Sequence, residues 1–270
     1  RQDAPGIPIQ ADTLFDLASL TKPLCTLQAM LCLIEEKKID WSGRLVDHIA
    51  YNAPKEYAAI RMEHLLSHSA GLKAYIPLYR HFQPFIDSTT RERLIKGIMA
   101  ENLVYEPGTQ SVYSDLGYIL LGEVIEAVSG RPLDDIFREK IAGPLQLQEK
   151  IQFRPIRQGA NRREKNIAAT ERCAWRGRII QGEVHDEHCW LLNGVAGHAG
   201  LFGSVEGVLD IAVSVLRQWQ GKTTHPGYTS TLLRKCMKRR YPERTWCLGF
   251  DTPSPVGSSA GKYMSAASVG

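Results

Sequence analysis

The sequence of 270 residues lacks a long hydrophobic run and has no strong excess of either charge. No apolar stretch reaches the roughly 18 residues that a membrane-spanning helix needs, so we expect no membrane span. The 33 basic and 29 acidic side chains leave a net charge of only +4. This charge is too small to indicate binding to a nucleic acid or to a membrane surface. No internal repeat is visible, and the chain opens on a polar stretch rather than on a secretory signal peptide.

The sequence also lacks the dense cysteine spacing of a disulfide scaffold, because its six cysteines are scattered. Cys25 and Cys32 lie two turns apart in an apolar stretch, and we interpret both as core residues. Free cysteines and the missing signal peptide slightly favour the cytoplasm, with the periplasm or cell envelope as the alternative. With 43% hydrophobic residues, the chain can bury one large core or two lobes. The oligomeric state stays open.

Residues 24–34 are almost all apolar, which is typical of a helix buried on every side. Pro23 is tolerated only in the first turn of a helix, because it has no N–H group. The pattern therefore predicts a helix that begins at Ser19, with Lys22 one turn further on the same face.

A lysine is unusual at this end of a buried helix. The positive end of the helix and burial both favour a neutral amine. A neutral amine three residues from a serine would be a base beside a nucleophile. The alternative is a serine that caps the helix and a lysine that extends to water. The spacing of Ser19 and Lys22 alone does not decide between the two.

A second candidate group is Tyr113-Ser114-Asp115, which follows a turn at Pro107-Gly108 and precedes a predicted helix over 116–128. Asp115 is a good N-cap for that helix, and Tyr113 could be an ordinary half-buried aromatic residue. The functional alternative is that the phenol of Tyr113 faces Ser19 and Lys22 and helps to move a proton.

Taken together, these groups and their flanks resemble the serine hydrolases related to class C β-lactamases and to penicillin-binding DD-peptidases. The resembling stretches are residues 14–22, 65–72, 107–118 and 194–202. The resemblance implies an α/β (α+β) fold of the β-lactamase/transpeptidase type, in which a helical lobe is inserted in an antiparallel sheet lobe. We expect residues 1–50 and 186–270 to form the sheet lobe, with its sheet incomplete in this chain, and residues 51–185 to form the helical lobe.

The first family motif, S-x-x-K, falls on Ser19 and Lys22, and the second, Y-x-N, falls on Tyr113 and Asp115. Aspartate in place of asparagine is a departure, because an ionised carboxylate cannot donate a hydrogen bond to a substrate carbonyl. Asp115 would hold Lys22 charged or bind a substrate that has a donor there. The third motif, K/H-x-G, is not matched by His198-Ala199-Gly200, whose flanks resemble another family segment. We expect it beyond Gly270.

The resemblance implies acyl transfer to water through an acyl-enzyme, with Ser19 as nucleophile and Lys22 and Tyr113 as proton-transfer groups. The substrate would be an amide or ester: a D-amino-acid peptide of the cell wall, a small ester or a β-lactam. Asp115 favours a peptidase or esterase over a true β-lactamase. No cofactor is expected. The alternative is a non-catalytic penicillin-binding or ligand-sensing domain with the same cleft.

A weaker alternative is a zinc site formed by His185, His188 and Cys189. No second ligand group at a suitable spacing supports it, so we expect a structural or surface role there and no metal. His68 is interpreted as a residue that packs in a turn. The basic runs over 154–165 and 234–240 lack interleaved aromatic residues, which favours solvated faces over nucleic-acid binding.

Overall fold

The computed structural model describes residues 8–49, 51–156, 166–240, 243–254, 256–258, 261, 263–265 and 268–270. The helices are α1 (Leu27–Glu35), α2 (Met62–Leu66), α3 (Thr90–Met99), α4 (Asp115–Ser129), α5 (Leu133–Ile136), α6 (Glu187–Leu191), α7 (Val205–Trp219) and α8 (Ser230–Cys236). The strands are β1 (Phe15–Asp16), β2 (Ile151–Phe153), β3 (Ala169–Cys173), β4 (Arg178–Gln181) and β5 (Leu201–Gly203). Part of the basic run over 154–165 lies outside the described residues.

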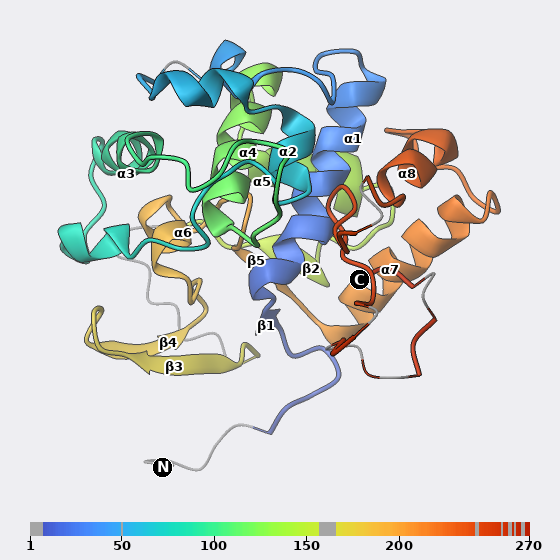
Figure 1. Ribbon diagram of the computed structural model, residues 1–270. Helices are drawn as coiled ribbons and strands as arrows, with labels where there is room; N and C mark the ends of the chain where they lie inside the picture. Colours follow the sequence, from blue (N-terminus) through green and yellow to red (C-terminus); the bar gives the residue numbers. More distant parts are fainter. Residues whose placement is uncertain are drawn as a thin grey trace.

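The strands form a small antiparallel sheet and a separate hairpin. In the sheet, β5 lies between β1 and β2, and Gly203 pairs with Phe15 on one side and Ile151 on the other. The hairpin of β3 and β4 lies at the edge of the molecule, below α6 (Figure 1). The combination of helices with antiparallel strands agrees with the expected α+β class. The boundaries predicted between a sheet lobe and a helical lobe stay a prediction.

The helix that carries Ser19 and Lys22 does not begin as a regular α-helix, which corrects the sequence-based prediction. A 3₁₀ turn over Ala18–Leu20 leads into a π-helical turn over Lys22–Thr26, and α1 follows at Leu27. Pro23 stands at the start of the π-helical turn, where its missing N–H is tolerated. The segment still brings Ser19 and Lys22 together at its N-terminal end.

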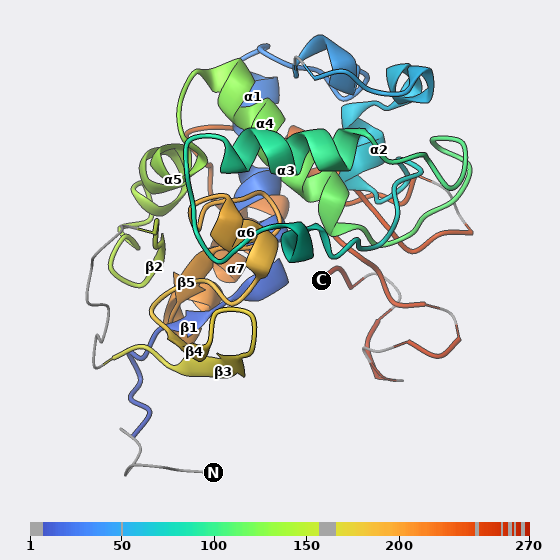
Figure 2. The same cartoon turned by 90° about the vertical axis from the view of Figure 1, so that its left-hand side faces the viewer.

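Helices α1 and α4 lie at the centre of the fold. Most of their side chains are buried, and Cys25 and Cys32 are fully buried free thiols, as expected of core residues. Figure 2 shows α3 lying across the outer side of α4, where Arg91 is paired with Glu123 and Glu126. No described helix combines the length and apolar character that a bilayer crossing requires.

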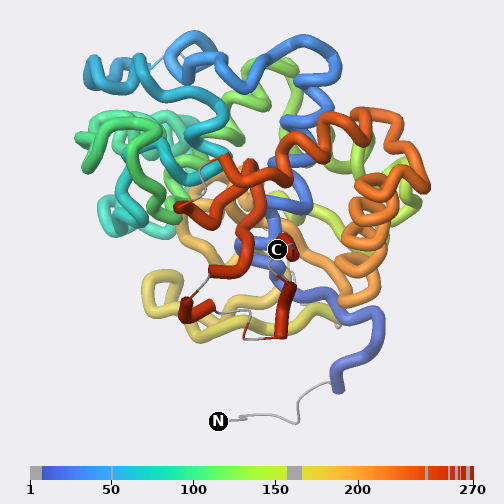
Figure 3. The backbone as a smooth tube through the Cα atoms, turned by 45° about the vertical axis from the view of Figure 1, so that its right-hand side comes forward, coloured from blue at the N-terminus to red at the C-terminus, as the bar shows by residue number. Residues whose placement is uncertain are grey.

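The last part of the chain returns to the central helices. Figure 3 shows this segment, in red, passing in front of the blue N-terminal helix. The Gly249 N–H donates to Leu66 O at 3.0 Å, and a side chain at Gly249 would stand 2.7 Å from Leu27. Gly249 also has a φ of +85°, which a residue without a Cβ adopts at little cost. This close approach brings Trp246 to the region of Tyr113.

Candidate active site

Ser19 is presented to solvent by a strained turn that Asp16 holds in place. Ala18, which precedes Ser19, has a φ of +45°, in the left-handed region that non-glycine residues rarely adopt. Asp16 Oδ1 accepts a hydrogen bond from the Ala18 N–H at 2.8 Å, and Asp16 Oδ2 accepts one from the His185 N–H at 2.6 Å. Burial raises the pKa of the Asp16 carboxyl, although both amides act against it. Asp16 thus ties the Ser19 turn to the chain before α6.

The Lys22 amine is the centre of the site. Its Nζ lies 2.9 Å from Ser19 Oγ, 2.6 Å from Tyr113 Oη and 2.7 Å from Asp115 Oδ1. The backbone oxygen of His198 is a fourth neighbour at 3.4 Å. The lysine side chain is 3% exposed. Four oxygen atoms around a buried amine, one of them a carboxylate, form the environment that an ammonium group with three N–H donors fits. The structure therefore brings together all four residues named from the sequence.

Tyr113 and Asp115 reach Lys22 from the start of α4. Ser114, in an extended conformation, is the N-cap residue, and Asp115 is the first residue of the helix. Of the two alternatives considered for Asp115, the N-cap role is therefore wrong by one residue. Its carboxylate lies in the first helical turn, where the positive end of the helix favours a negative charge. The Ser114 hydroxyl donates to Lys73 O at 2.7 Å, which fixes the loop on which Tyr113 stands.

A pair formed by the buried His198 and the partly exposed Asp186 supports the site from the side of β5. The His198 ring is 1% exposed, and its Nε2 lies 2.8 Å from Asp186 Oδ1. Asp186 also accepts the Cys189 N–H at 2.7 Å and so caps α6. Burial alone would raise the pKa of Asp186, but His198 and the Cys189 amide outweigh it and hold the pKa well below its usual range. His198 was seen in the sequence only as part of a rejected motif, and its pairing with Asp186 was missed.

The zinc alternative gains no support from the described part of the chain. His188 Nε2 accepts the Tyr79 N–H at 3.3 Å, and the Cys189 thiol donates to Ala199 O at 3.2 Å. Burial raises the pKa of that thiol far above its usual value, which disfavours the thiolate that zinc binds. Among the described residues, groups that could hold a metal converge only at Glu171, Cys173 and Glu187. His185, His188 and Cys189 do not form such a group.

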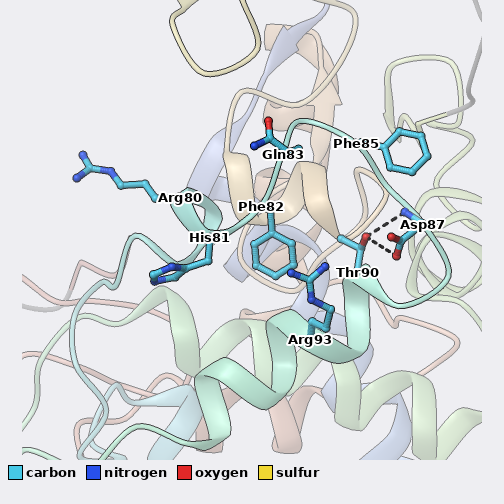
Figure 4. A pocket seen from close by; sticks show the side chains of 8 residues that line it. All are labelled: Arg80, His81, Phe82, Gln83, Phe85, Asp87, Thr90 and Arg93. Carbon is cyan, nitrogen blue, oxygen red and sulfur yellow. Dashed lines mark hydrogen bonds between the residues drawn. The ribbon is translucent and has the colours of Figure 1, made fainter.

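A separate hollow of about 350 Å³ lies between the turn over Leu78–His81 and α3. Figure 4 shows Phe82 and Arg93 lining it, and two hydrogen bonds between Asp87 and Thr90: the Asp87 N–H donates to Thr90 Oγ1, and that hydroxyl donates to Asp87 Oδ1. The residues that line it do not include Ser19, Lys22, Tyr113 or Asp115. It is therefore distinct from the cluster around Lys22.

Known proteins share sequence with much of this chain. The model of the beta-lactamase family matches residues 1–239. The N-acetylmuramyl-L-alanine amidase of Bacillus subtilis is 33% identical over 213 residues, which are 72% of this chain and 48% of that protein. The putative D-alanyl-D-alanine carboxypeptidase of Escherichia coli K12 is 34% identical over 228 residues, 76% of this chain and 51% of that protein. This chain thus spans about half the length of these relatives.

Solved structures confirm the expected fold type. The penicillin-binding protein of Bacillus halodurans aligns with a TM-score of 0.69 and 18% identity, covering 93% of this chain and 72% of that one. At this level of identity the match shows a shared fold and nothing about function. The fold expected from the sequence, of the β-lactamase/transpeptidase type, is therefore confirmed, and the chain belongs to the beta-lactamase family.

Proposed function

We propose that this chain carries the nucleophile of a serine hydrolase that acts on an amide or ester through an acyl-enzyme. The observation that carries the proposal is the position of Lys22 Nζ, within 2.9 Å of Ser19 Oγ, Tyr113 Oη and Asp115 Oδ1 at once. Ser19 is exposed while Lys22 is buried behind it. A carbonyl can thus approach the hydroxyl from solvent, with a proton acceptor on the protein side.

The ion pair with Asp115 implies a specific order of proton transfers. The resting ammonium of Lys22 first passes a proton to Asp115, 2.7 Å away, and becomes a free amine. Ser19 Oγ then attacks the carbonyl carbon, and its proton moves to that amine. Tyr113 donates its phenolic proton to the leaving group and is reprotonated by Lys22 at 2.6 Å. Asp115 finally returns its proton to Lys22, so that the net result is transfer of the serine proton to the leaving group.

The tetrahedral intermediate carries a negative oxygen that needs N–H donors. The backbone N–H of Ser19 is one such donor, as the resemblance implies. Each such donor lowers the activation free energy by about 3–4 kcal/mol. Water then attacks the acyl-enzyme, with the same groups moving the proton in the reverse direction. This second step separates a hydrolase from a protein that only becomes acylated.

The substrate we favour is a D-amino-acid peptide of the cell wall or a small ester. The amidase and carboxypeptidase names of the relatives support a cell-wall peptide. Asp115 supports a peptidase or esterase over a true β-lactamase, because its ionised carboxylate cannot donate to a substrate amide oxygen. Its side chain is 24% exposed, so the oxygen that does not contact Lys22 can accept a hydrogen bond from a substrate N–H.

The test is labelling and turnover with the Ser19→Ala variant. A fluorescent penicillin or a fluorophosphonate should label the unaltered chain and leave Ser19→Ala unlabelled. Ser42→Ala, which changes an exposed serine that bonds to Asp40, is the control and should label normally. Labelling that persists in Ser19→Ala would reject Ser19 as the nucleophile.

Turnover distinguishes the two functions that remain. Steady hydrolysis of a D-alanyl-D-alanine peptide or of a chromogenic ester supports the hydrolase. Acylation of Ser19 without release of product would favour the alternative, a non-catalytic penicillin-binding or ligand-sensing domain.

A further inference from the structure

We infer that His68 is a positioning residue that holds the phenol of Tyr113 against Lys22. The inference deepens the proposed function and rests on it for its catalytic meaning. His68 follows α2 and is 3% exposed, and its side chain is no part of the cluster around the Lys22 amine. Its hydrogen bonds reach the residues on either side of Tyr113, and its ring contacts the rings of Tyr113, Tyr118 and Trp246.

The first part of the argument is a pair of backbone hydrogen bonds. The His68 carbonyl oxygen accepts the Val112 N–H at 2.8 Å, and His68 Nδ1 accepts the Ser114 N–H at 3.0 Å. One residue therefore fixes the chain immediately before and immediately after Tyr113. Tyr105 reinforces the first bond, because its hydroxyl donates to the same His68 oxygen at 3.2 Å. With both neighbours fixed, only the side-chain torsions of Tyr113 are left to set the position of its phenol.

The second part is the packing of the rings, which limits those torsions. The His68 ring lies 4.5 Å from the Tyr113 ring and 4.5 Å from the Trp246 ring, measured between centroids. Trp246 also contacts Tyr113 at 5.6 Å, so the three rings touch one another. Tyr113 is 38% exposed and could otherwise turn towards solvent. Offset ring contacts of this kind stabilise one orientation. That orientation leaves the phenol 2.6 Å from the Lys22 amine.

The third part is the state of His68 itself. Because Nδ1 accepts a hydrogen bond, the neutral ring carries its proton on Nε2. Burial, followed by the charge of Lys22, lowers the pKa of His68 to about 3, so the ring keeps this acceptor at neutral pH. His68 also has a φ of +53°, a strained conformation that the surrounding fold must maintain. These features suit a fixed acceptor that acts through Tyr113.

Two substitutions distinguish the effect of the Nδ1 hydrogen-bond acceptor from the effect of the packed ring. In His68→Asn, the amide oxygen stands close to the position of Nδ1, and asparagine tolerates a positive φ. In His68→Leu, the apolar volume is kept and the acceptor is lost. His64→Leu is the matched control, because His64 Nδ1 accepts the Arg61 N–H at the other end of α2, away from Tyr113. Thermal unfolding of each variant shows whether it is folded before kinetics are compared.

The kinetic test uses Tyr113→Phe as a second background. We expect His68→Leu to lower kcat at least tenfold with a small change in KM, His68→Asn to fall between it and the unaltered chain, and His64→Leu to change little. In the Tyr113→Phe background, His68→Leu should cost less than about twofold, because its effect passes through the missing phenol. An equal loss in both backgrounds, or no loss in either, would overturn the inference.

A second readout does not depend on activity. In chain labelled with ¹³Cζ-tyrosine, the Tyr113 signal is the one that Tyr113→Phe removes. His68→Leu should shift that signal, whereas His64→Leu should leave it unchanged. If His68→Leu does not fold, the comparison is made with His68→Asn, which should shift the signal by a smaller amount. A shifted signal in a chain without hydrolysis would reject the proposed function and keep the positioning role, and an unshifted signal in an active chain would reject the role alone.

Discussion

Lys22 Nζ lies 2.7 Å from Asp115 Oδ1, and the two side chains differ in exposure, at 3% for Lys22 and 24% for Asp115. The buried member of the pair is the cation, and its counter-ion stands at the edge of the solvent. Removal of the carboxylate would therefore leave a buried positive charge without compensation, which is the costly way to break such a pair.

Asp115→Asn tests this relationship, because asparagine keeps an oxygen near Lys22 and loses the charge. We expect the free energy of unfolding at neutral pH to fall by about 2 kcal/mol, measured by urea titration. We also expect kcat/KM to fall about tenfold or more, because the asparagine amide cannot take the proton that Lys22 passes to Asp115 in the proposed mechanism. Glu101→Gln breaks the more exposed pair with Lys73 and should cost less than about 1 kcal/mol. An Asp115→Asn effect no larger than this control would contradict the prediction.

Because of His68, the free energy of unfolding should decrease as the pH falls below about 6.5. Its pKa is lowered from 6.5 to about 3 by burial and by Lys22, so between these values the unfolded chain binds a proton that the folded chain does not. This contribution is complete above about pH 6.5 and is lost as the pH falls towards 3. Between about pH 7 and pH 4.5 we expect on the order of 2 kcal/mol from this residue. Urea titrations at several pH values should show a shallower acid slope for His68→Asn, and identical slopes would argue against the assignment.

Two glycines in α4 should respond in opposite ways to alanine. A Cβ at Gly122 would stand 2.8 Å from the backbone nitrogen of Gly197, which cannot move aside as a flexible side chain would. A Cβ at Gly117 would meet nothing nearer than Leu65 Cδ2 at 3.5 Å, an ordinary contact. We expect Gly122→Ala to destabilise by about 2 kcal/mol or more, and Gly117→Ala to be neutral or stabilising by up to about 1 kcal/mol. Thermal unfolding of both variants measures this, and equal melting temperatures would refute the predicted contact.

Asp186 should stabilise the fold in two separable ways. It caps α6, and its negative charge faces His198. Asp186→Asn keeps an acceptor for the Cys189 N–H and loses the charge that faces His198, whereas Asp186→Ala loses both. We expect Asp186→Ala to be less stable than Asp186→Asn by about 1 kcal/mol.

The charge contribution of Asp186 has its own pH signature. The pKa of Asp186 is held below its usual value, so its charge stabilises the fold above about pH 4 and the benefit is lost as the pH falls. The advantage of the unaltered chain over Asp186→Asn should therefore shrink in acid. A difference that does not change with pH would contradict the pairing with His198.

Local sequence features were sufficient to predict that Ser19 and Lys22 lie side by side next to a buried helix. The apolar run after Pro23 predicts a buried helix, and the spacing of Ser19 and Lys22 predicts one shared face. The π-helical turn over Lys22–Thr26 could not be foreseen, because it depends on how the surrounding chain packs. The distance from Tyr113 to Lys22 was predicted only through the family resemblance, since no local pattern links residues so far apart.

The contacts that support the site could not be predicted from the sequence either, because they join segments that are far apart in the chain. Asp186 and His198 come together because α6 and the chain before β5 fold back on each other, and neither residue has a neighbour pattern that shows this. His68 was predicted to pack in a turn, and it does lie in the turn that follows α2, but its hydrogen bond to Ser114 joins two segments separated by α3. Polar pairs of this kind are specified by tertiary packing rather than by periodicity.

Trp246 lies far from Tyr113 in the sequence, yet its ring packs against the rings of Tyr113 and His68. During translation, Ser19, Lys22 and Tyr113 are therefore synthesised well before Trp246, whose ring restrains Tyr113. Contacts between such distant segments form late, because a long loop must close first. During synthesis the ring of Tyr113 would thus stay less restrained until Trp246 has docked against it.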